Sequence, residues 1–124
     1  MRKKILSILL LFTAFIVKAQ VTITPSSFNV TDQITITVST AAQSCNLIGT
    51  SPAKVYMHAG IGDDSNAFGF SVIGNWGQDD SVGLMTNNGN GTWSITLTPS
   101  TYFGLNATQQ ANAKKLGMVF RNAS

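Results

Sequence analysis

Apolar and polar residues alternate along much of this chain, and the clearest run is residues 34–39, with the sequence ITITVS. Successive side chains of a β-strand point to opposite faces, so this run predicts a strand with one buried face and one polar face. The same period predicts shorter strands at residues 21–23 and 55–59. The chain is therefore expected to fold mainly from short strands.

A turn signal lies at residues 88–91, NGNG, because asparagine and glycine tolerate the positive φ angles of tight hairpins. This turn is expected to join a strand at residues 82–85 to a strand at residues 92–98. Apolar residues of the second strand share one face, so Trp93 is expected to lie in the core.

One short helix is predicted near residue 106. Asn106 can cap it, Gln109 can bond back to the cap, and Lys114 and Lys115 would then lie in its last turn. Residues 116–121 follow as a further strand, and the sequence stops three residues later. The predicted fold class is all-β: an antiparallel immunoglobulin-like β-sandwich with one short helix, lacking its last strand.

The N-terminus has the layout of a secretory signal peptide. Residues 2–4 are basic, and residues 5–17 (ILSILLLFTAFIV) are uncharged. That apolar run is too short to span a bilayer, which takes about 20 residues. We therefore expect residues 1–19 to be a signal peptide and residues 20–124 to form one secreted module, extracellular or at the cell surface.

Removal of the signal peptide changes the charge of the chain. Four of the eight basic residues lie before residue 20, and the remaining four face five aspartates, so the net charge falls from +3 to −1. The remaining sequence then has no excess of basic residues to bind nucleic acid or an anionic membrane, and neither is expected as a partner. Cys45 is the only cysteine, and two interpretations stay open: a buried thiol, or a partner outside this chain.

The sequence contains few candidate catalytic residues. His58 is the only histidine, and Cys45 has no neighbouring cation to lower its thiol pKa, so a Cys–His dyad is not expected. The acidic pairs at residues 63–64 and 79–80 are interpreted as solvated or turn-capping residues, and a calcium site with Asn66 is the minor alternative. We expect no enzyme activity of this chain, no catalytic residue, no metal and no cofactor.

Trp76 differs from Trp93 because it lies in residues 74–80, GNWGQDD, where no apolar alternation surrounds it. An indole in a loop rich in amides and carboxylates can stack on a sugar ring while its neighbours bond the hydroxyl groups. The alternative is that Trp76 folds back as a lid over the end of the sandwich. Aromatic and polar residues of this loop and the preceding one form the candidate ligand-binding set. Its members are Trp76, Gln78, Asp79, Asp80, Phe68 and Phe70.

Four segments together resemble a recurring extracellular module of proteins that Gram-negative bacteria export through the type IX secretion system. They are residues 55–60 (VYMHAG), 74–80 (GNWGQDD), 89–95 (GNGTWSI) and 116–122 (LGMVFRN). Such modules often accompany α-amylase-type glycoside hydrolases and a C-terminal sorting domain. The resemblance covers about residues 21–122.

The resemblance implies a non-catalytic immunoglobulin-like module that binds a polysaccharide such as a starch-like glucan, or spaces an attached enzyme from the cell surface. It also implies covalently attached downstream domains, one of which could be a glycoside hydrolase. The function expected from the sequence is carbohydrate binding in a larger polysaccharide-degrading protein. The alternative is a structural or adhesive spacer with no ligand of its own, and a buried Trp76 would favour it.

Overall fold

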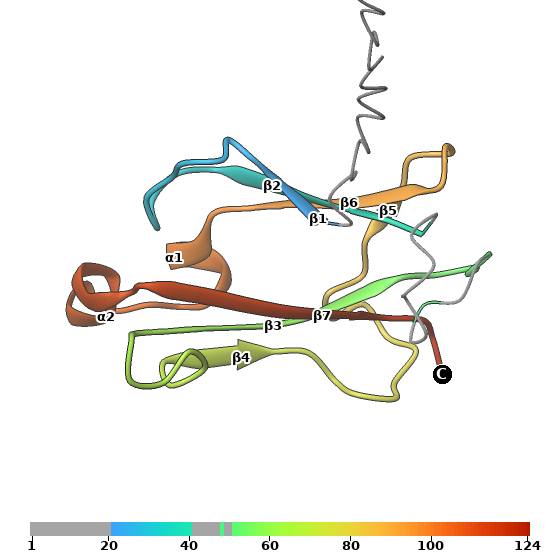
Figure 1. The fold of residues 1–124 in the computed structure, drawn as a ribbon. Helices are drawn as coiled ribbons and strands as arrows, with labels where there is room; N and C mark the ends of the chain where they lie inside the picture. The colour runs from blue at the N-terminus through green and yellow to red at the C-terminus, as the bar shows by residue number, and fades with distance from the viewer. Residues whose placement is uncertain (1–20, 41–47, 49–50) are drawn as a thin grey trace, which may run out of the picture.

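Two antiparallel sheets pack face to face in the computed structural model, which describes residues 21–40, 48 and 51–124 (Figure 1). The first sheet has the order β1 (Val21–Thr24), β2 (Ile34–Ser39), β6 (Thr92–Leu97), β5 (Thr86–Asn87). The second sheet has the order β4 (Ser71–Ile73), β3 (Tyr56–Gly62), β7 (Lys115–Arg121). The all-β sandwich is confirmed. The predicted signal peptide and Cys45 lie outside the described residues.

The strand order agrees with the immunoglobulin arrangement. That fold places strands A, B, E and D in one sheet and strands C, F and G in the other. Here β1, β2, β6 and β5 take the first four places, and β3 and β7 take those of C and F, with β4 on the far side of β3. Among the described residues, no strand lies on the outer side of β7, where strand G would pair.

The core fills the space between the two sheets. The apolar face of β2, which sequence alternation predicts, is buried: Ile34, Ile36 and Val38 are at most 1% exposed. Trp93 is 5% exposed and stands opposite Val38 in the β2–β6 ladder, so its predicted place in the core is confirmed. Phe120 supplies an aromatic ring from the second sheet.

The predicted hairpin turn at residues 88–91 is confirmed, with the Asn88 amide donating to the Thr92 carbonyl at 3.0 Å. The strand before the turn is β5, however, and not residues 82–85. Those earlier residues contact the start of β3 instead, since the Met85 amide donates to the Val55 carbonyl at 2.9 Å. The chain thus touches the second sheet before it crosses to the first, which hydrophobic alternation alone does not reveal.

Helix α2 (Ala107–Asn112) begins with the predicted capping box. The Asn106 side chain accepts from the Gln109 amide at 2.9 Å, and the Gln109 side chain accepts from the Asn106 amide at 3.0 Å. The prediction that Lys114 and Lys115 belong to its last turn is wrong. The Lys114 amide donates to Gly62 at 2.8 Å, so pairing with β3 has replaced the helix by then.

A second short helix, α1 (Pro99–Tyr102), was not predicted. It begins with a proline directly after β6. Proline suits the first helical position, because its fixed φ angle fits a helix and its missing amide proton is not needed there.

The two tryptophans should differ sharply in their effect on stability. Trp93→Ala is expected to lower the free energy of unfolding by about 3 to 5 kcal/mol, because it removes a buried ring and leaves a cavity. Trp76→Ala is the matched control and should cost about 1 kcal/mol or less, since its side chain is 55% exposed. Urea unfolding of both variants measures this, and equal losses would contradict the assignment of Trp93 to the core.

Candidate functional site

Most exposed large hydrophobic side chains of the described residues gather on the outer face of the β4–β3–β7 sheet. Val119 stands opposite His58 in the ladder, and Val72 stands opposite Gly60. Paired residues share a face of the sheet, and Ala59, which lies between His58 and Gly60, is buried on the opposite, core-facing side. Phe68 and Trp76 complete a surface that we call the outer patch. Its members are Phe68, Val72, Trp76 and Val119, with His58 beneath Trp76.

Phe68 covers one end of the outer patch. A Cβ atom on Gly60 would overlap the Phe68 ring, and one on Gly117 would lie 2.6 Å from its Cζ atom. These two glycines pair across β3 and β7, so the bare backbone of two strands makes room for the ring. Phe68 is still 46% exposed, and its ring therefore lies on the sheet without being buried in it.

Trp76 occupies the other end of the outer patch. Its ring meets the His58 ring edge to face, with centroids 5.8 Å apart and an interplanar angle of 79°. Gly74 also lies against His58, since a Cβ atom on this glycine would overlap the imidazole. The Trp76 side chain is 55% exposed, so it does not form the lid that the sequence left open as an alternative. This geometry presents the indole to solvent from a defined position.

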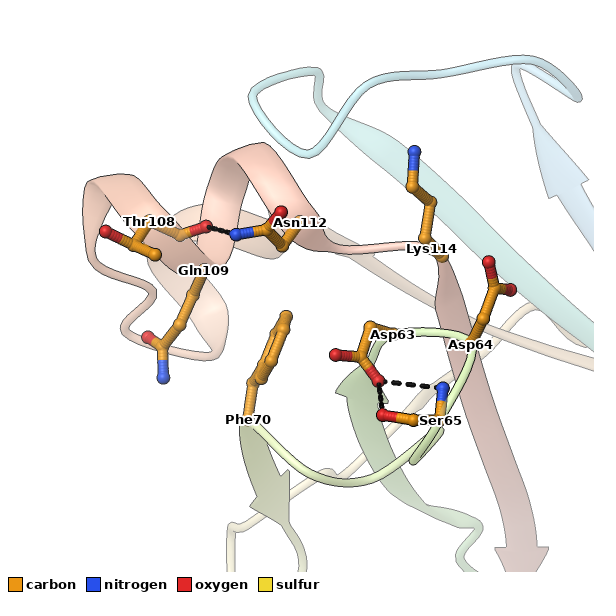
Figure 2. Close-up of a pocket in the computed structure, with 8 residues that line it drawn as sticks. All are labelled: Asp63, Asp64, Ser65, Phe70, Thr108, Gln109, Asn112 and Lys114. Atoms are coloured by element: carbon orange, nitrogen blue, oxygen red, sulfur yellow. Dashed lines mark hydrogen bonds between the residues drawn. The ribbon is translucent and has the colours of Figure 1, made fainter.

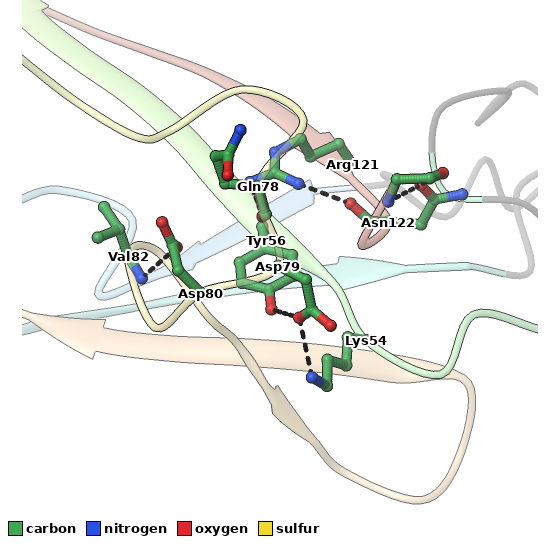
Figure 3. Close-up of polar contacts among 9 residues, drawn as sticks. Lys54, Tyr56, Gln78, Asp79, Asp80, Val82, Arg121 and Asn122 are labelled. Atoms are coloured by element: carbon green, nitrogen blue, oxygen red, sulfur yellow. Dashed lines mark hydrogen bonds and ion pairs between the residues drawn. The ribbon is translucent and has the colours of Figure 1, made fainter.

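The loop that carries Trp76 is fastened to the sheet by Arg121, the last residue of β7. Arg121 is 2% exposed, and its Nη2 atom donates to the carbonyls of Asn75 at 2.7 Å and Gln78 at 2.8 Å. Its Nη1 atom donates to the Asn122 carbonyl at 2.9 Å (Figure 3). The guanidinium carbon lies 4.5 Å from the centroid of the Tyr56 ring, a cation–π contact. The carbonyls on both sides of Trp76 are therefore fixed by one buried cation.

Asp79 forms a second attachment of this loop. Its carboxylate accepts hydrogen bonds from the Tyr56 hydroxyl and from Lys54 Nζ, the latter at 2.8 Å (Figure 3). The bond from Lys54 holds the pKa of Asp79 below its ordinary value, and the Tyr56 hydroxyl adds to the effect. The same bonds to Asp79 raise the pKa of both Lys54 and Tyr56.

Asp80 closes the loop on itself. One oxygen accepts from the Asn75 side chain at 2.8 Å, and the other accepts from the Val82 amide at 2.8 Å. The Asn75 amide, more than the Val82 amide, lowers the pKa of Asp80. Both carboxylates of this loop thus make hydrogen bonds within the protein.

The structure separates the predicted ligand-binding residues into three groups. Trp76 and Phe68 belong to the outer patch, and Gln78 is exposed beside it. Asp79 and Asp80 hold the loop in place. Phe70 does not extend the platform: it packs against the core and lines a groove of about 410 Å³ between the β3–β4 turn and α2 (Figure 2).

Asp63 lies beside this groove and caps the β3–β4 turn. Its Oδ1 atom accepts from the Ser65 amide at 2.9 Å, the Ser65 hydroxyl at 2.7 Å and the Asn66 amide at 3.0 Å. The Ser65 hydroxyl makes the largest contribution to the lowered pKa of Asp63. This agrees with the turn-capping interpretation of the sequence. The described residues contain no group of three or more His, Cys, Asp or Glu side chains placed to hold a metal ion.

His58 makes none of the contacts of a catalytic base in the described structure. Its Nδ1 atom is buried and has no hydrogen-bond partner there, and its ring contacts Gly74 and Trp76. This geometry gives His58 a positioning role, because its imidazole packs edge to face against the Trp76 ring.

Sequence reasoning missed the residues that build the site around Trp76. Val72 and Val119 supply apolar area, and Arg121 and Tyr56 anchor the loop. One signal was available in the sequence: a strand glycine such as Gly60 often marks a place where another group approaches the backbone closely. Nothing local indicates that Arg121 reaches residues more than 40 positions earlier.

No protein-family model matches this chain, and no curated protein matches it significantly. Within the described residues, no helix is both long and apolar enough to cross a membrane.

Replacing Arg121 tests whether it holds the Trp76 loop. Arg121→Met keeps an apolar stem but removes the donors to three carbonyls, so we expect a loss of about 2 to 3 kcal/mol in unfolding free energy. Hydrogen exchange of residues 74–82 should also accelerate. Lys115→Met, at the exposed opposite end of β7, is the control and should change stability by about 0.5 kcal/mol or less. Unchanged exchange of the loop in Arg121→Met would contradict the anchoring role.

The pH dependence of stability should report on Asp79 and Asp80. Their folded-state pKa values are lowered, so the stabilisation is present at pH values above the ordinary aspartate pKa of about 4 and is lost as the pH falls through the folded-state values. Asp80→Asn should flatten this acid loss in urea unfolding at pH 7 and pH 3. Asp64→Asn is the control, because its only described contact is a 4.0 Å ion pair with Lys115. Equal acid slopes in all three proteins would refute the role of Asp80.

Proposed function

We propose that this chain is a secreted, non-catalytic carbohydrate-binding module whose outer patch contacts a polysaccharide. The observation that carries the proposal is the 55% exposed indole of Trp76, held by His58 on the face of a rigid sheet. Aromatic rings contribute large contact area, and a fixed ring loses little conformational freedom when a ligand binds. Sugar rings offer apolar C–H faces that suit such a surface.

The shape of the outer patch suits an extended ligand. Phe68 covers Gly60, which lies two residues along β3 from His58, a separation of roughly 7 Å. Val72 and Val119 flank this line on the neighbouring strands. In the proposed complex, a glycan chain stacks on Trp76 and Phe68 along this line, with Val72 and Val119 in contact with its two sides.

Hydroxyl groups at the edge of a bound glycan would meet the polar side of the Trp76 loop. Gln78 is exposed there, and within the described residues only its backbone atoms form hydrogen bonds. Asp79 and Asp80 are not assigned this role, because their carboxylates already bind Lys54, Tyr56 and Asn75. The proposed site relies on apolar contact more than on hydrogen bonds.

The spacer hypothesis rests on the same surface. An apolar sheet face with few unoccupied polar groups also suits permanent contact with a neighbouring domain. Binding of a glycan by the isolated chain distinguishes the two functions.

Affinity electrophoresis through gels with soluble starch, β-glucan, xylan or no polymer tests the proposal. We expect soluble starch to retard the chain. Trp76→Ala should weaken this retention about tenfold or more, the loss typical of a central aromatic contact. Trp76→Phe should keep part of it, and Val119→Ser should weaken it less.

Thr22→Ala serves as the control, since Thr22 is an exposed residue of β1 in the other sheet. Its retention should equal that of the parent chain. Unchanged mobility of a folded chain in every polymer would refute carbohydrate binding and favour the spacer.

A further inference from the structure

Strand β7 is an edge strand with an open side. It pairs with β3 over seven residues, Lys115–Arg121, and no strand among the described residues pairs with its other side. In an antiparallel strand, successive residues direct their amide and carbonyl groups alternately to the two sides. Part of the β7 backbone therefore presents donors and acceptors to the open side. An edge of this kind is a template for another strand.

The inward side chains near this edge are also incompletely covered. On the central strand β3, Met57, Ala59 and Ile61 are at most 3% exposed. On β7, Leu116 and Met118 face the same core but are only half-buried. A further strand would cover them from the open side.

A groove of about 370 Å³ lies at the N-terminal end of β7. Phe28 and Val30, which follow edge strand β1 of the first sheet, form one side, and Leu116 contributes to the other. Asn29, Gln110, Lys114 and Lys115 also line it, so the groove mixes apolar and polar groups and has two lysines at the start of β7. In Figure 2 the Lys114 side chain points away from the Asp63 carboxylate. Within the described residues Lys114 forms no ion pair.

We propose that β7 binds an extended segment of a separate polypeptide, which adds to the sheet as an antiparallel strand. The segment carries apolar residues at alternate positions, which cover Leu116 and Met118, and an acidic residue near its C-terminal end, which reaches Lys114. Antiparallel pairing follows the pattern of all the described ladders. This interaction does not require the carbohydrate site, because it uses the strand edge and not the sheet face.

Charge argues against a second copy of the chain as the occupant. Two β7 strands in antiparallel register would place Lys115 of one copy opposite Arg121 of the other. Like charges directly opposite each other destabilise a pair of strands. A segment with an acidic C-terminal end places opposite charges together at the lysine end of β7 instead.

A synthetic peptide of about nine residues, with alternating valine and threonine and two C-terminal aspartates, spans β7 and tests the proposal. We expect it to bind the chain and to protect the amides of residues 115–121 from hydrogen exchange. Amides of residues 71–73, on the opposite edge of the same sheet, should stay unprotected. The same peptide with a central proline should bind at least about tenfold more weakly, because proline removes a ladder donor.

Reversing the charge of Lys114 tests the assigned orientation of the bound segment. Lys114→Glu should weaken binding of the aspartate-ended peptide several-fold and strengthen binding of a lysine-ended peptide. Thr86→Glu, which adds negative charge on β5 in the other sheet, controls for net charge. Equal effects of the two variants would overturn the assigned orientation.

A covalently tethered peptide tests the edge site even when the free peptide has a low affinity for the chain. Fusing the peptide after Ser124 through a short glycine–serine linker raises its effective concentration to the millimolar range. Stabilisation by the tethered strand and its loss with the central proline would support the edge site. Binding seen only in the tethered form would overturn a separate polypeptide as the source. No protection of residues 115–121 in either form, or dimerisation of the chain through β7 alone, would overturn the proposal.

Discussion

A buried guanidinium organises the outer surface of the second sheet. A charged group taken out of water must have close partners, and Arg121 finds them in the carbonyls of Asn75 and Gln78 and in the ring of Tyr56. Both carbonyls belong to the loop that contains Trp76. Without this contact the loop would have only Asp79 and its own hydrogen bonds to hold it. The position of the exposed indole is therefore fixed by Arg121, a residue of strand β7.

The parts of the fold that sequence predicts are those governed by local periodicity. Residues 34–39 and Trp93 lie where alternation places them, and the Asn106 capping box forms because its two partners are three residues apart. The roles of Asp79 and Asp80 could not be predicted in this way. Lys54 is 25 residues from Asp79, so a carboxylate that looks available in the sequence is occupied in the fold.

Phe68 and Phe70 illustrate a second limit of sequence reasoning. Both were predicted to extend the Trp76 platform because they lie in the loop before it. Only residues 71–73 are strand, however, and the turn before β4 sends Phe68 over Gly60 and Phe70 toward the core. The pair of glycines at positions 60 and 117 was the better signal, but pairing of β3 with β7 had to be known to use it.

The two proposed interactions meet at β7. Val119 projects from this strand into the outer patch, and the backbone of the same strand forms the open edge. A segment paired with that edge would place its outward side chains beside Val119, because directly opposed residues share a face. The apolar surface would then extend by one strand without any movement of Trp76. A strand partner with aromatic outward residues would lengthen the glycan platform, whereas one with charged residues would limit it to the outer patch of this chain.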